Sequence, residues 1–311
     1  MKVYHSLDEV PFIGNAVLTI GNFDGVHVGH AHILKSLVDQ EVDGLQSMVV
    51  TMWPHPRKVL NPELEGLRFL TSIEEKINLL SDIGIDHLLI IPFTKAFSEL
   101  TALFFVQEIL HNKIGVKKIV LGYDHCFGKN REGGLAFLSK YTQVFKYELQ
   151  EIPKQEVDSL AVSSSKIRHF LESGQLSEAK ALLGRNYSLS GLVVEGNKLG
   201  RTIGFPTANI FVSFEEKLIP KNGVYAVRVN VANEVYKGMM NIGYRPTVSG
   251  NSLSLEVNIF DFNQDIYGQT ISVEFVHYLR EEQKFNSLEA LKNQLQADKE
   301  NTYMLFQKTQ F

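Results

Sequence analysis

Compact apolar runs alternate with amphipathic stretches through the first half of the 311-residue chain. The apolar runs are rich in β-branched residues or leucine, and they predict strands buried on both faces. We expect these strands at Ala16–Ile20, Ser47–Thr51, His87–Ile91 and Lys118–Leu121. Helical spacing of apolar residues predicts helices between them, at Gly29–Val42, Ser72–Ile83 and Ala102–Leu110. Strands that alternate with helices indicate an α/β fold, a parallel sheet with helices on both faces.

The pattern changes in the second half of the chain. Two further helices are expected at Ser164–Glu172 and Ser177–Leu183, and the α/β pattern ends near Gly184. A chain of this length exceeds one ordinary core, so two domains are favoured. We place them at residues 1–184 and 185–311.

Apolar and polar residues alternate beyond Tyr187. The alternation is clearest over 225–231 and 253–259, as is typical of half-buried strands. Turns that contain glycine separate these runs and indicate a small antiparallel β-barrel. Helical spacing returns over 287–306, which predicts a terminal helix.

Composition and charge narrow the class of protein. The net charge of −4 provides no general basic face for nucleic acid. Cys126 is the single cysteine, which excludes intrachain disulfides and fits a reducing compartment. Acidic side chains interrupt the first twelve residues where a signal peptide would be apolar, and the apolar run Leu88–Phe93 is too short to cross a bilayer. We therefore expect a cytoplasmic protein without a membrane or nucleic-acid partner.

The segment Gly21–His30 is the first that predicts chemistry. It joins the first strand to the first helix, the position where open α/β sheets bind ligands. Its glycines allow close approach of the backbone, and a helix N-terminus favours an anion. His27 and His30 are three residues apart, so both imidazoles can face one phosphate chain. Two alternatives are a pair of structural histidines and a metal site of His27, His30 and Asp24.

A second anion-binding segment is expected at residues 162–168, which read VSSSKIR. Its serines can cap the N-terminus of the helix that follows. Arg168, in the first turns of that helix, can clamp a triphosphate. The alternatives are purely structural capping serines and an arginine on the solvated surface.

The segment Gly196–Asn209 predicts a phosphate loop of another kind. Three glycines spaced by four residues make a flexible loop, and the spacing matches neither a Walker loop nor a dinucleotide-binding fingerprint. Thr207 and Asn209 share a face of an extended strand, and their oxygens suit a Mg²⁺ ion shared with ATP. An ordinary glycine and proline turn is the alternative. Glu256, as a polar residue on a half-buried strand, would by pattern alone face solvent.

Together these segments resemble the bacterial bifunctional riboflavin kinase/FAD synthetase family. The first half carries H-x-G-H after a strand, and further segments follow in the family's order at residues 51–56, 122–128 and 162–168. The second half carries G-x-x-x-G-R-x-x-G-F-P-T-A-N and then L-E-V-x-I-F, followed by matching segments at 241–247 and 279–285. The resemblance covers nearly the whole chain. Departures from the family's more common residues are Ala31, Tyr123, His125, Cys126 and Ser165.

The resemblance implies an N-terminal Rossmann-like FMN adenylyltransferase domain and a C-terminal riboflavin kinase barrel. It assigns Glu256 as general base, Thr207 and Asn209 as ligands of Mg²⁺, and His27, His30 and Arg168 as catalytic groups on ATP phosphates. Other residues implied to bind ATP or its phosphates are Gly21, Asn22, Phe23, Asp24, Gly25, Gly29, Ser163, Ser164, Gly196, Gly200, Arg201, Gly204 and Pro206. Residues implied to bind flavin are Asp124, Asn241, Gly243 and Arg280.

The substrates implied are ATP, riboflavin and FMN. Riboflavin offers a hydroxyl, which benefits from a base such as Glu256, whereas the phosphate of FMN is largely ionised and needs none. Three other interpretations stay open at this stage. They are an enzyme with one failed activity, a flavin-binding regulator without turnover, and a nucleotidyltransferase for another acceptor, such as a pantetheine phosphate.

Overall fold

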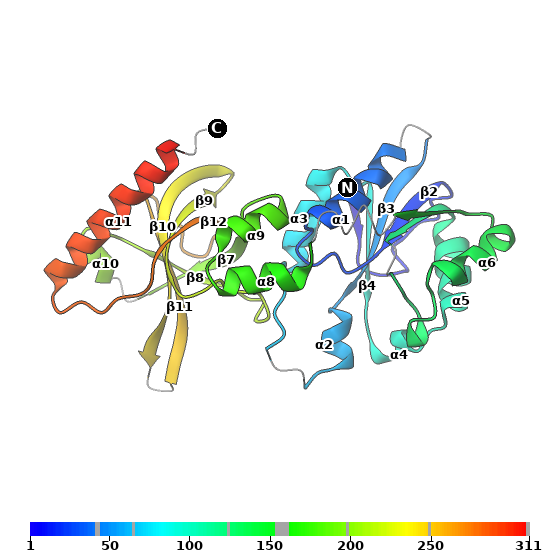
Figure 1. Cartoon of the computed structure of the whole chain (residues 1–311), viewed down its shortest axis with the longest axis horizontal. Coiled ribbons are helices and arrows are strands. Elements are labelled where there is room, and N and C mark those ends of the chain that lie inside the picture. The colour runs from blue at the N-terminus through cyan, green and yellow to red at the C-terminus, as the bar shows by residue number, and fades with distance from the viewer. Residues whose placement is uncertain are drawn as a thin grey trace. The chain divides into compact units, whose positions relative to one another are not determined.

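The computed structural model describes residues 1–40, 44–63, 66–122, 125–152, 162–196, 199–247 and 250–308. The chain divides into two compact units, Met1–Ser164 and Ser165–Phe311 (Figure 1). The division falls within helix α8 (Ser164–Glu172), so most of α8 and all of α9 (Leu176–Leu183) belong to the second unit. The domain limit expected at Gly184 comes after both helices and stays a prediction.

The first unit is built on a six-stranded parallel sheet with the strand order β1-β4-β3-β2-β5-β6. Its strands are β1 (Lys2–Tyr4), β2 (Ala16–Ile20), β3 (Gln46–Trp53), β4 (His87–Pro92), β5 (Val116–Gly122) and β6 (Glu148–Ile152). Every residue of β2 is buried, as expected of a strand covered on both faces.

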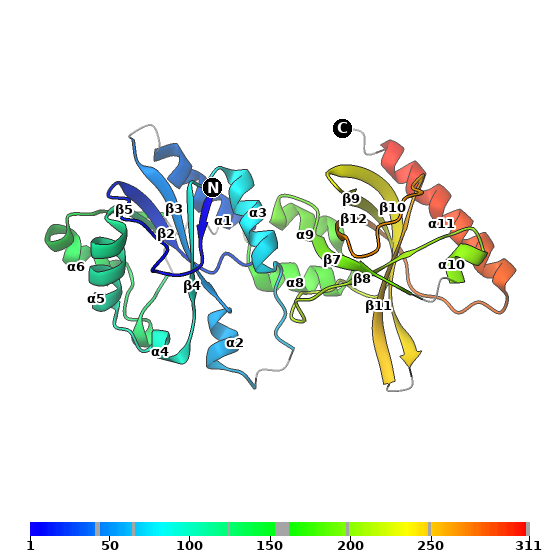
Figure 2. The same cartoon turned by 180° about the vertical axis from the view of Figure 1, so that it is seen from behind.

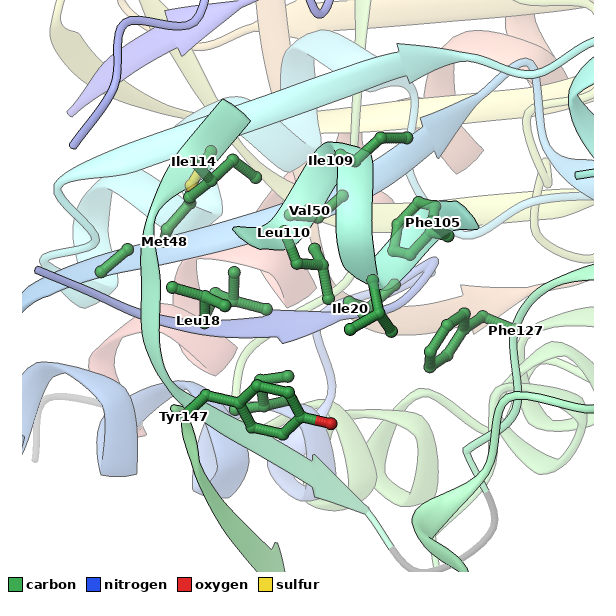
Figure 3. Packing of buried hydrophobic residues seen from close by; sticks show 14 of the residues in the cluster. Leu18, Ile20, Met48, Val50, Phe105, Ile109, Leu110, Ile114, Phe127 and Tyr147 are labelled. Carbon is green, nitrogen blue, oxygen red and sulfur yellow. The ribbon is translucent and has the colours of Figure 1, made fainter. Parts of the chain in front are cut away.

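Helices cover both faces of this sheet. On one face, alternate residues of β2 to β5 pack against η2 (Phe105–Ile114) and α6 (Leu135–Phe145), and Figure 3 shows Leu18 and Ile20 of β2 in this cluster with Phe105 and Leu110 of η2. On the other face, the strands meet α1 (Val28–Val38) and α3 (Ile73–Ile83). The predicted α/β class is therefore confirmed.

Some elements of the first unit differ from expectation. The helix expected at Ala102–Leu110 is a short α5 (Ala102–Phe104) that continues as the π-helix η2, whose wider hydrogen-bond spacing still leaves Phe105, Ile109 and Leu110 packed on the sheet. Helix α1 ends at Val38, and residues 41–42 of the expected helix lie outside the described residues. Elements without a sequence prediction are β1, β6, α2 (Pro56–Leu60), α4 (Lys95–Ser98), η3 (Lys129–Arg131) and α6.

The second unit contains a closed antiparallel barrel with the strand order β10-β11-β8-β7-β12-β9 (Figure 2). Its strands are β7 (Ser188–Val194), β8 (Ala208–Phe211), β9 (Gly223–Val231), β10 (Glu234–Thr247), β11 (Gly250–Ile259) and β12 (Thr270–Arg280). The alternation predicted for β9 is confirmed, since Tyr225, Val227 and Val229 are fully buried. In β11, Leu253 is exposed although Leu255 and Val257 are buried, whereas the polar Asn258 is buried.

Helix α11 (Leu288–Lys308) lies across one side of the barrel, in red in Figure 1. Its Leu295 and Tyr303 pack against a buried cluster of Phe205, Met239 and Phe260. The expected terminal helix and small barrel are thus confirmed. In the described ranges, no helix combines the length and the apolar character that crossing a bilayer would need.

Candidate active sites

The segment Gly21–His30 leaves the sheet where its strand order reverses. After β2 the chain forms α1 on one face, whereas after β5 it forms α6 on the other. Open α/β sheets bind ligands in the crevice that such a divergence leaves beyond the carboxyl ends of the strands. The segment predicted to bind phosphate therefore lies where this topology provides room for a ligand.

Backbone strain marks this loop. Phe23 and Val26 have φ angles of 46° and 38°, with Gly25 at 82° between them. The left-handed region suits Gly25, but a β-branched valine rarely adopts it. Phe23 and Val26 are buried in the core beneath α1 and α3, which holds the strained backbone in place. The result is a fixed turn directly before α1.

The two histidines of the loop stack on each other. The ring centroids of His27 and His30 are 3.6 Å apart, and their planes differ by 15°. His27 is the N-cap of α1, and its Nδ1 accepts a hydrogen bond from the backbone N–H of His30 at 3.3 Å. A Cβ on Gly29 would lie 2.9 Å from Val162 and 3.4 Å from the His27 ring, so this position has no room for a side chain. Two imidazoles thus lie at a helix N-terminus, which favours an anion.

Asp24 binds backbone groups of the protein. Its Oδ1 accepts hydrogen bonds from the N–H groups of Leu70 at 2.9 Å and Thr71 at 3.2 Å. Its carbonyl oxygen accepts a hydrogen bond from Ser164 Oγ at 3.1 Å. Asp24 therefore joins the loop to the segment before α3 and to the first residue of α8. Contact of Asp24 with ATP stays a prediction.

The alternative metal site has no geometric support. In the part of the chain that the structure describes, no three His, Cys, Asp or Glu side chains gather closely enough to hold an ion. The carboxylate of Asp24 faces Leu70 and Thr71, while His27 and His30 face each other. Binding of an anion by the histidine pair stays a prediction.

A buried lysine beside this loop was not predicted from the sequence. Lys76 on α3 is 2% exposed, and its Nζ lies 5.5 Å from the centroid of the Trp53 ring. Burial lowers the pKa of Lys76 to about 8, although the nearby carboxylate of Asp24 acts to raise it. Helical spacing alone places a lysine in solvent, so only the contact with Trp53, which follows from the tertiary fold, identifies it.

Two buried polar atoms lie near the carboxyl ends of neighbouring strands. Asn22 Oδ1 follows β2 and Thr51 Oγ1 lies near the end of β3, and neither has a hydrogen-bond partner among the described residues. Buried polar groups are ordinarily hydrogen-bonded, so such atoms fit a site that a ligand completes. Thr51 belongs to the segment matched to the family, although no separate role was predicted for it.

Other predicted residues of the first site are only partly placed. Gly21 directly follows β2, and Ser163 is exposed just before α8. Arg168 is half-buried on α8, one turn after Ser164, and belongs to the second unit. Asp124 lies outside the described residues. The roles of these residues stay predictions.

The barrel brings its predicted chemical groups together. Glu256 on β11 is half-buried, and its Oε1 accepts a hydrogen bond from Ser254 Oγ at 3.0 Å. Its Oε2 accepts a hydrogen bond from Thr207 Oγ1 at 3.3 Å. Across the ladder Glu256 pairs with Asn209 of β8. A hydroxyl, an amide and a carboxylate oxygen are the hard donors that Mg²⁺ prefers, so these side chains fit the predicted ion.

The segment Gly196–Asn209 supplies two members of this cluster and approaches it again at Gly196. A Cβ on Gly196 would lie 2.1 Å from Asn209 Nδ2, so any side chain there would displace the amide. The remaining predicted residues follow in a short helix, α10 (Leu199–Thr202), and the turn after it: Gly200, Arg201, Gly204 and Pro206. Their contacts with ATP stay predictions, and residues 197–198 lie outside the described residues.

Two neighbours of Glu256, Ser254 and Asn258, were not predicted from the sequence. Ser254, Glu256 and Asn258 share one face of β11, because side chains alternate along a strand, and we call them the polar stripe. Asn258 is 6% exposed, and its Nδ2 donates to the carbonyl oxygen of Pro206 at 2.5 Å. This bond fixes the residue before Thr207. The two-residue spacing on a strand was the available signal, although only the fold shows the partners.

The predicted flavin residues engage other groups of the barrel unit. Asn241 Nδ2 donates to Glu282 Oε1 at 3.3 Å, and a Cβ on Gly243 would lie 1.8 Å from the same oxygen. Arg280 binds Asp298 of α11 through Nε, at 3.0 and 3.1 Å, and through Nη2 at 2.7 Å. Its guanidinium therefore ties the end of β12 to α11. Flavin contacts of Asn241, Gly243 and Arg280 stay predictions.

Comparison with known proteins covers both units. Residues 11–166 match the family model of FAD synthetase, and residues 183–306 match that of riboflavin kinase. A bifunctional riboflavin kinase/FMN adenylyltransferase of Listeria monocytogenes is 41% identical over 298 residues, which cover 94% of this chain and 93% of the relative. One of Haemophilus influenzae is 39% identical over 97% of each chain.

A solved structure has the same fold over the full length. This crystal structure, described as a macrolide-efflux protein from Streptococcus pneumoniae, superposes with a TM-score of 0.84 at 32% identity. The likeness covers 97% of this chain and 98% of that one. It confirms the architecture of a parallel sheet unit followed by a barrel.

The folds and the matched families define a two-part transferase, with a nucleotidyltransferase unit followed by a kinase unit. The chain belongs to the family of bifunctional riboflavin kinase/FMN adenylyltransferases. The expected family and its two activities are thereby confirmed.

Proposed function

We propose that the residues grouped above carry the two steps from riboflavin to FAD. The barrel transfers the γ-phosphoryl group of ATP to riboflavin, which gives FMN and ADP. The sheet unit transfers the AMP moiety of a second ATP to FMN, which gives FAD and pyrophosphate. The observation that carries the proposal is the cluster around Glu256. Thr207 donates a hydrogen bond to Glu256, and Asn209 pairs with Glu256 in register.

Glu256 acts as the general base of the kinase step. The hydroxyl of riboflavin is a poor nucleophile at neutral pH, and a positioned carboxylate that takes its proton speeds the attack. The hydroxyl oxygen bonds to the γ-phosphorus as the bond to the bridging oxygen breaks and ADP leaves. Thr207 and Asn209 would hold Mg²⁺, which supplies charge neutralisation at the phosphates. Gly196 keeps the space in which the Asn209 amide lies.

The sheet unit needs no base for its step. The second pKa of a phosphate monoester is about 6, so FMN presents an ionised nucleophile at neutral pH. The task is to bring two anions together at the α-phosphorus, in line with the departing pyrophosphate. His27, His30 and the N-terminus of α1 offer donors for that charge, and Ser164 adds to them. The buried oxygens of Asn22 and Thr51 fit contacts with the bound nucleotide or flavin.

A cytoplasmic location belongs to the same proposal. ATP and reduced thiols are available there, and the single cysteine fits that setting.

One time course tests the proposed pathway. Purified protein is incubated with riboflavin, ATP and Mg²⁺, and FMN and FAD are separated by chromatography. We expect FMN first and its conversion to FAD later. Accumulation of FMN without FAD would mean that the sheet unit is impaired or serves another acceptor. Bound flavin without either product would contradict the proposal and favour a regulator.

A further inference from the structure

We propose that Ser254 is a positioning residue for riboflavin phosphorylation, which holds the Glu256 carboxylate in the orientation that receives the proton. The inference rests on the proposed role of Glu256 as general base. It goes beyond the family assignment, because neither the sequence motifs nor the comparisons give Ser254 a role.

The two oxygens of Glu256 are each held by a hydroxyl. Ser254 Oγ donates to Oε1 at 3.0 Å, and Thr207 Oγ1 donates to Oε2 at 3.3 Å. An ionised carboxylate only accepts hydrogen bonds, so both hydroxyl protons point toward it. The lone pairs of Thr207 Oγ1 then remain available for the metal ion that this residue is proposed to bind. Ser254 carries no such second task, and its bond acts on the carboxylate alone.

The geometry explains why the bond affects orientation. Three rotatable bonds join a glutamate carboxylate to its backbone, and fixing them opposes side-chain entropy. Hydrogen bonds from opposite ends of the carboxylate define its plane, because one donor lies on the same strand and the other on a separate segment. A carboxylate can accept about four hydrogen bonds, so the bonds from Ser254 and Thr207 do not by themselves prevent it from taking a proton.

The strand itself places Ser254. Residues two apart on β11 share a face, and two members of the polar stripe bind the segment Gly196–Asn209, Glu256 through Thr207 and Asn258 through Pro206. Asn258 fixes the carbonyl oxygen of Pro206, and so the chain next to Thr207. On the other side of Glu256, Ser254 pairs in register with Gly243 of β10. Ser254 thus holds Glu256 itself, whereas Asn258 fixes the chain beside Thr207, the other donor to Glu256.

The test compares Ser254→Ala and Ser254→Thr in the full chain. FMN formation from riboflavin and ATP is measured at varied concentrations of both substrates. We expect S254A to lower kcat roughly 10- to 100-fold, as for loss of one hydrogen bond to a charged group, with KM for both substrates nearly unchanged. We expect S254T to retain kcat within about threefold, because it keeps the hydroxyl and suits a strand. Ser252→Ala, exposed on the same strand, is the matched control and leaves kcat unchanged.

Placing the Ser254→Ala substitution in the Glu256→Gln variant separates an effect on the position of Glu256 from an effect on folding. If Ser254 acts through Glu256, then S254A has no further effect on the residual rate of Glu256→Gln. An equal loss in both backgrounds, or a raised KM for ATP with kcat intact, would overturn the inference. The inference would also be overturned if S254A left kcat unchanged while E256Q abolished FMN formation. In that case the assignment of Glu256 as the base would still stand. Full activity of E256Q would instead remove the base assignment and the inference with it. Thermal melting and FAD formation from added FMN check that each variant is folded.

Discussion

In the sheet unit, the candidate catalytic groups lie mainly on one loop and the helix that follows it, whereas in the barrel they come from segments 49 residues apart. The loop is held by left-handed backbone at buried residues and by the cap of α1. The barrel groups are held by strand register and side-chain hydrogen bonds. A site that binds anions can use backbone and rings on one local turn. A site that moves a proton needs a side chain fixed from more than one direction.

The largest effect is expected at Glu256 in the barrel. Glu256→Gln keeps the shape of the side chain and removes its ability to take a proton, so we expect FMN formation to fall by about 10³-fold. FAD formation from added FMN should stay unchanged. Initial rates of both steps check the prediction, and Glu234→Gln, exposed on β10, serves as the control. If Glu256→Gln abolished both FMN formation and FAD formation from added FMN, the two steps would not depend on separate sets of residues.

The next effect concerns the stacked histidines. His27→Asn preserves an N-cap for α1, since asparagine caps well, but it removes the imidazole. We expect FAD formation from FMN and ATP to fall by about 100-fold, as when one donor to developing charge is removed. FMN formation and the melting temperature should not change. His32→Asn, exposed on the same helix, is the matched control, and an unchanged rate in H27N would exclude the imidazole from the site.

A third prediction concerns the charge buried in the sheet unit. Burial lowers the pKa of Lys76 to about 8 in the folded chain, against about 10.5 when it is unfolded. The unfolded chain therefore holds this proton more strongly, and stability falls as the pH drops from about 10.5 to 8. Relative to Lys76→Met, the free energy of unfolding of the unmodified chain should rise by on the order of 3 kcal/mol across that window.

Denaturant titrations at several pH values measure this difference for Lys76. Lys35→Met, exposed on α1, provides the control, because it should show no such dependence relative to the unmodified chain. If the difference in the free energy of unfolding between K76M and the unmodified chain stayed constant between pH 8 and 10.5, the prediction of a lowered pKa for Lys76 would be wrong.

The smallest effect is expected at the amino ends of the strands, where His87 begins β4. Burial lowers the pKa of His87, whose Nδ1 lies 3.0 Å from Tyr4 Oη and whose Nε2 lies 2.7 Å from Gln46 Oε1. A neutral His87 is favoured in the folded chain, so its contribution to stability is present above about pH 6.5 and declines as the pH falls below that value. His87→Gln should flatten the decline in melting temperature, and His5→Gln should not. Neither substitution should alter either activity.

The sequence predicted much of the fold because its elements have strong local signals. The buried strand β2 was located to the residue, and α3 begins with a capping box at Ser72 that confirms its expected start. Strand β6 was missed because four of its five residues are not buried and give no apolar run. The π-helix was missed because side-chain periodicity does not separate it from an α-helix.

The sites were predictable only in part. The segments that contain His27, Thr207 and Glu256 could be found from their order in the chain. Ser254 and Asn258 could not be assigned, because their partners come from segments that only the fold brings near. Lys76 was missed for the same reason, since the ring of Trp53 that it contacts and the charge of Asp24 that raises its pKa belong to separate elements.

The paired contacts between Arg280 and Asp298 have a consequence for how this chain tolerates substitution. Both oxygens of Asp298 accept from the guanidinium, and the carboxylate is 2% exposed. Lysine cannot reproduce this planar, two-point contact, so Arg280→Lys is not a conservative change. Replacing either partner leaves a buried charge uncompensated, whereas replacing both with apolar residues does not. In a library selected for folded protein, we expect these two positions to change together, which would make residues 280 and 298 a covarying pair.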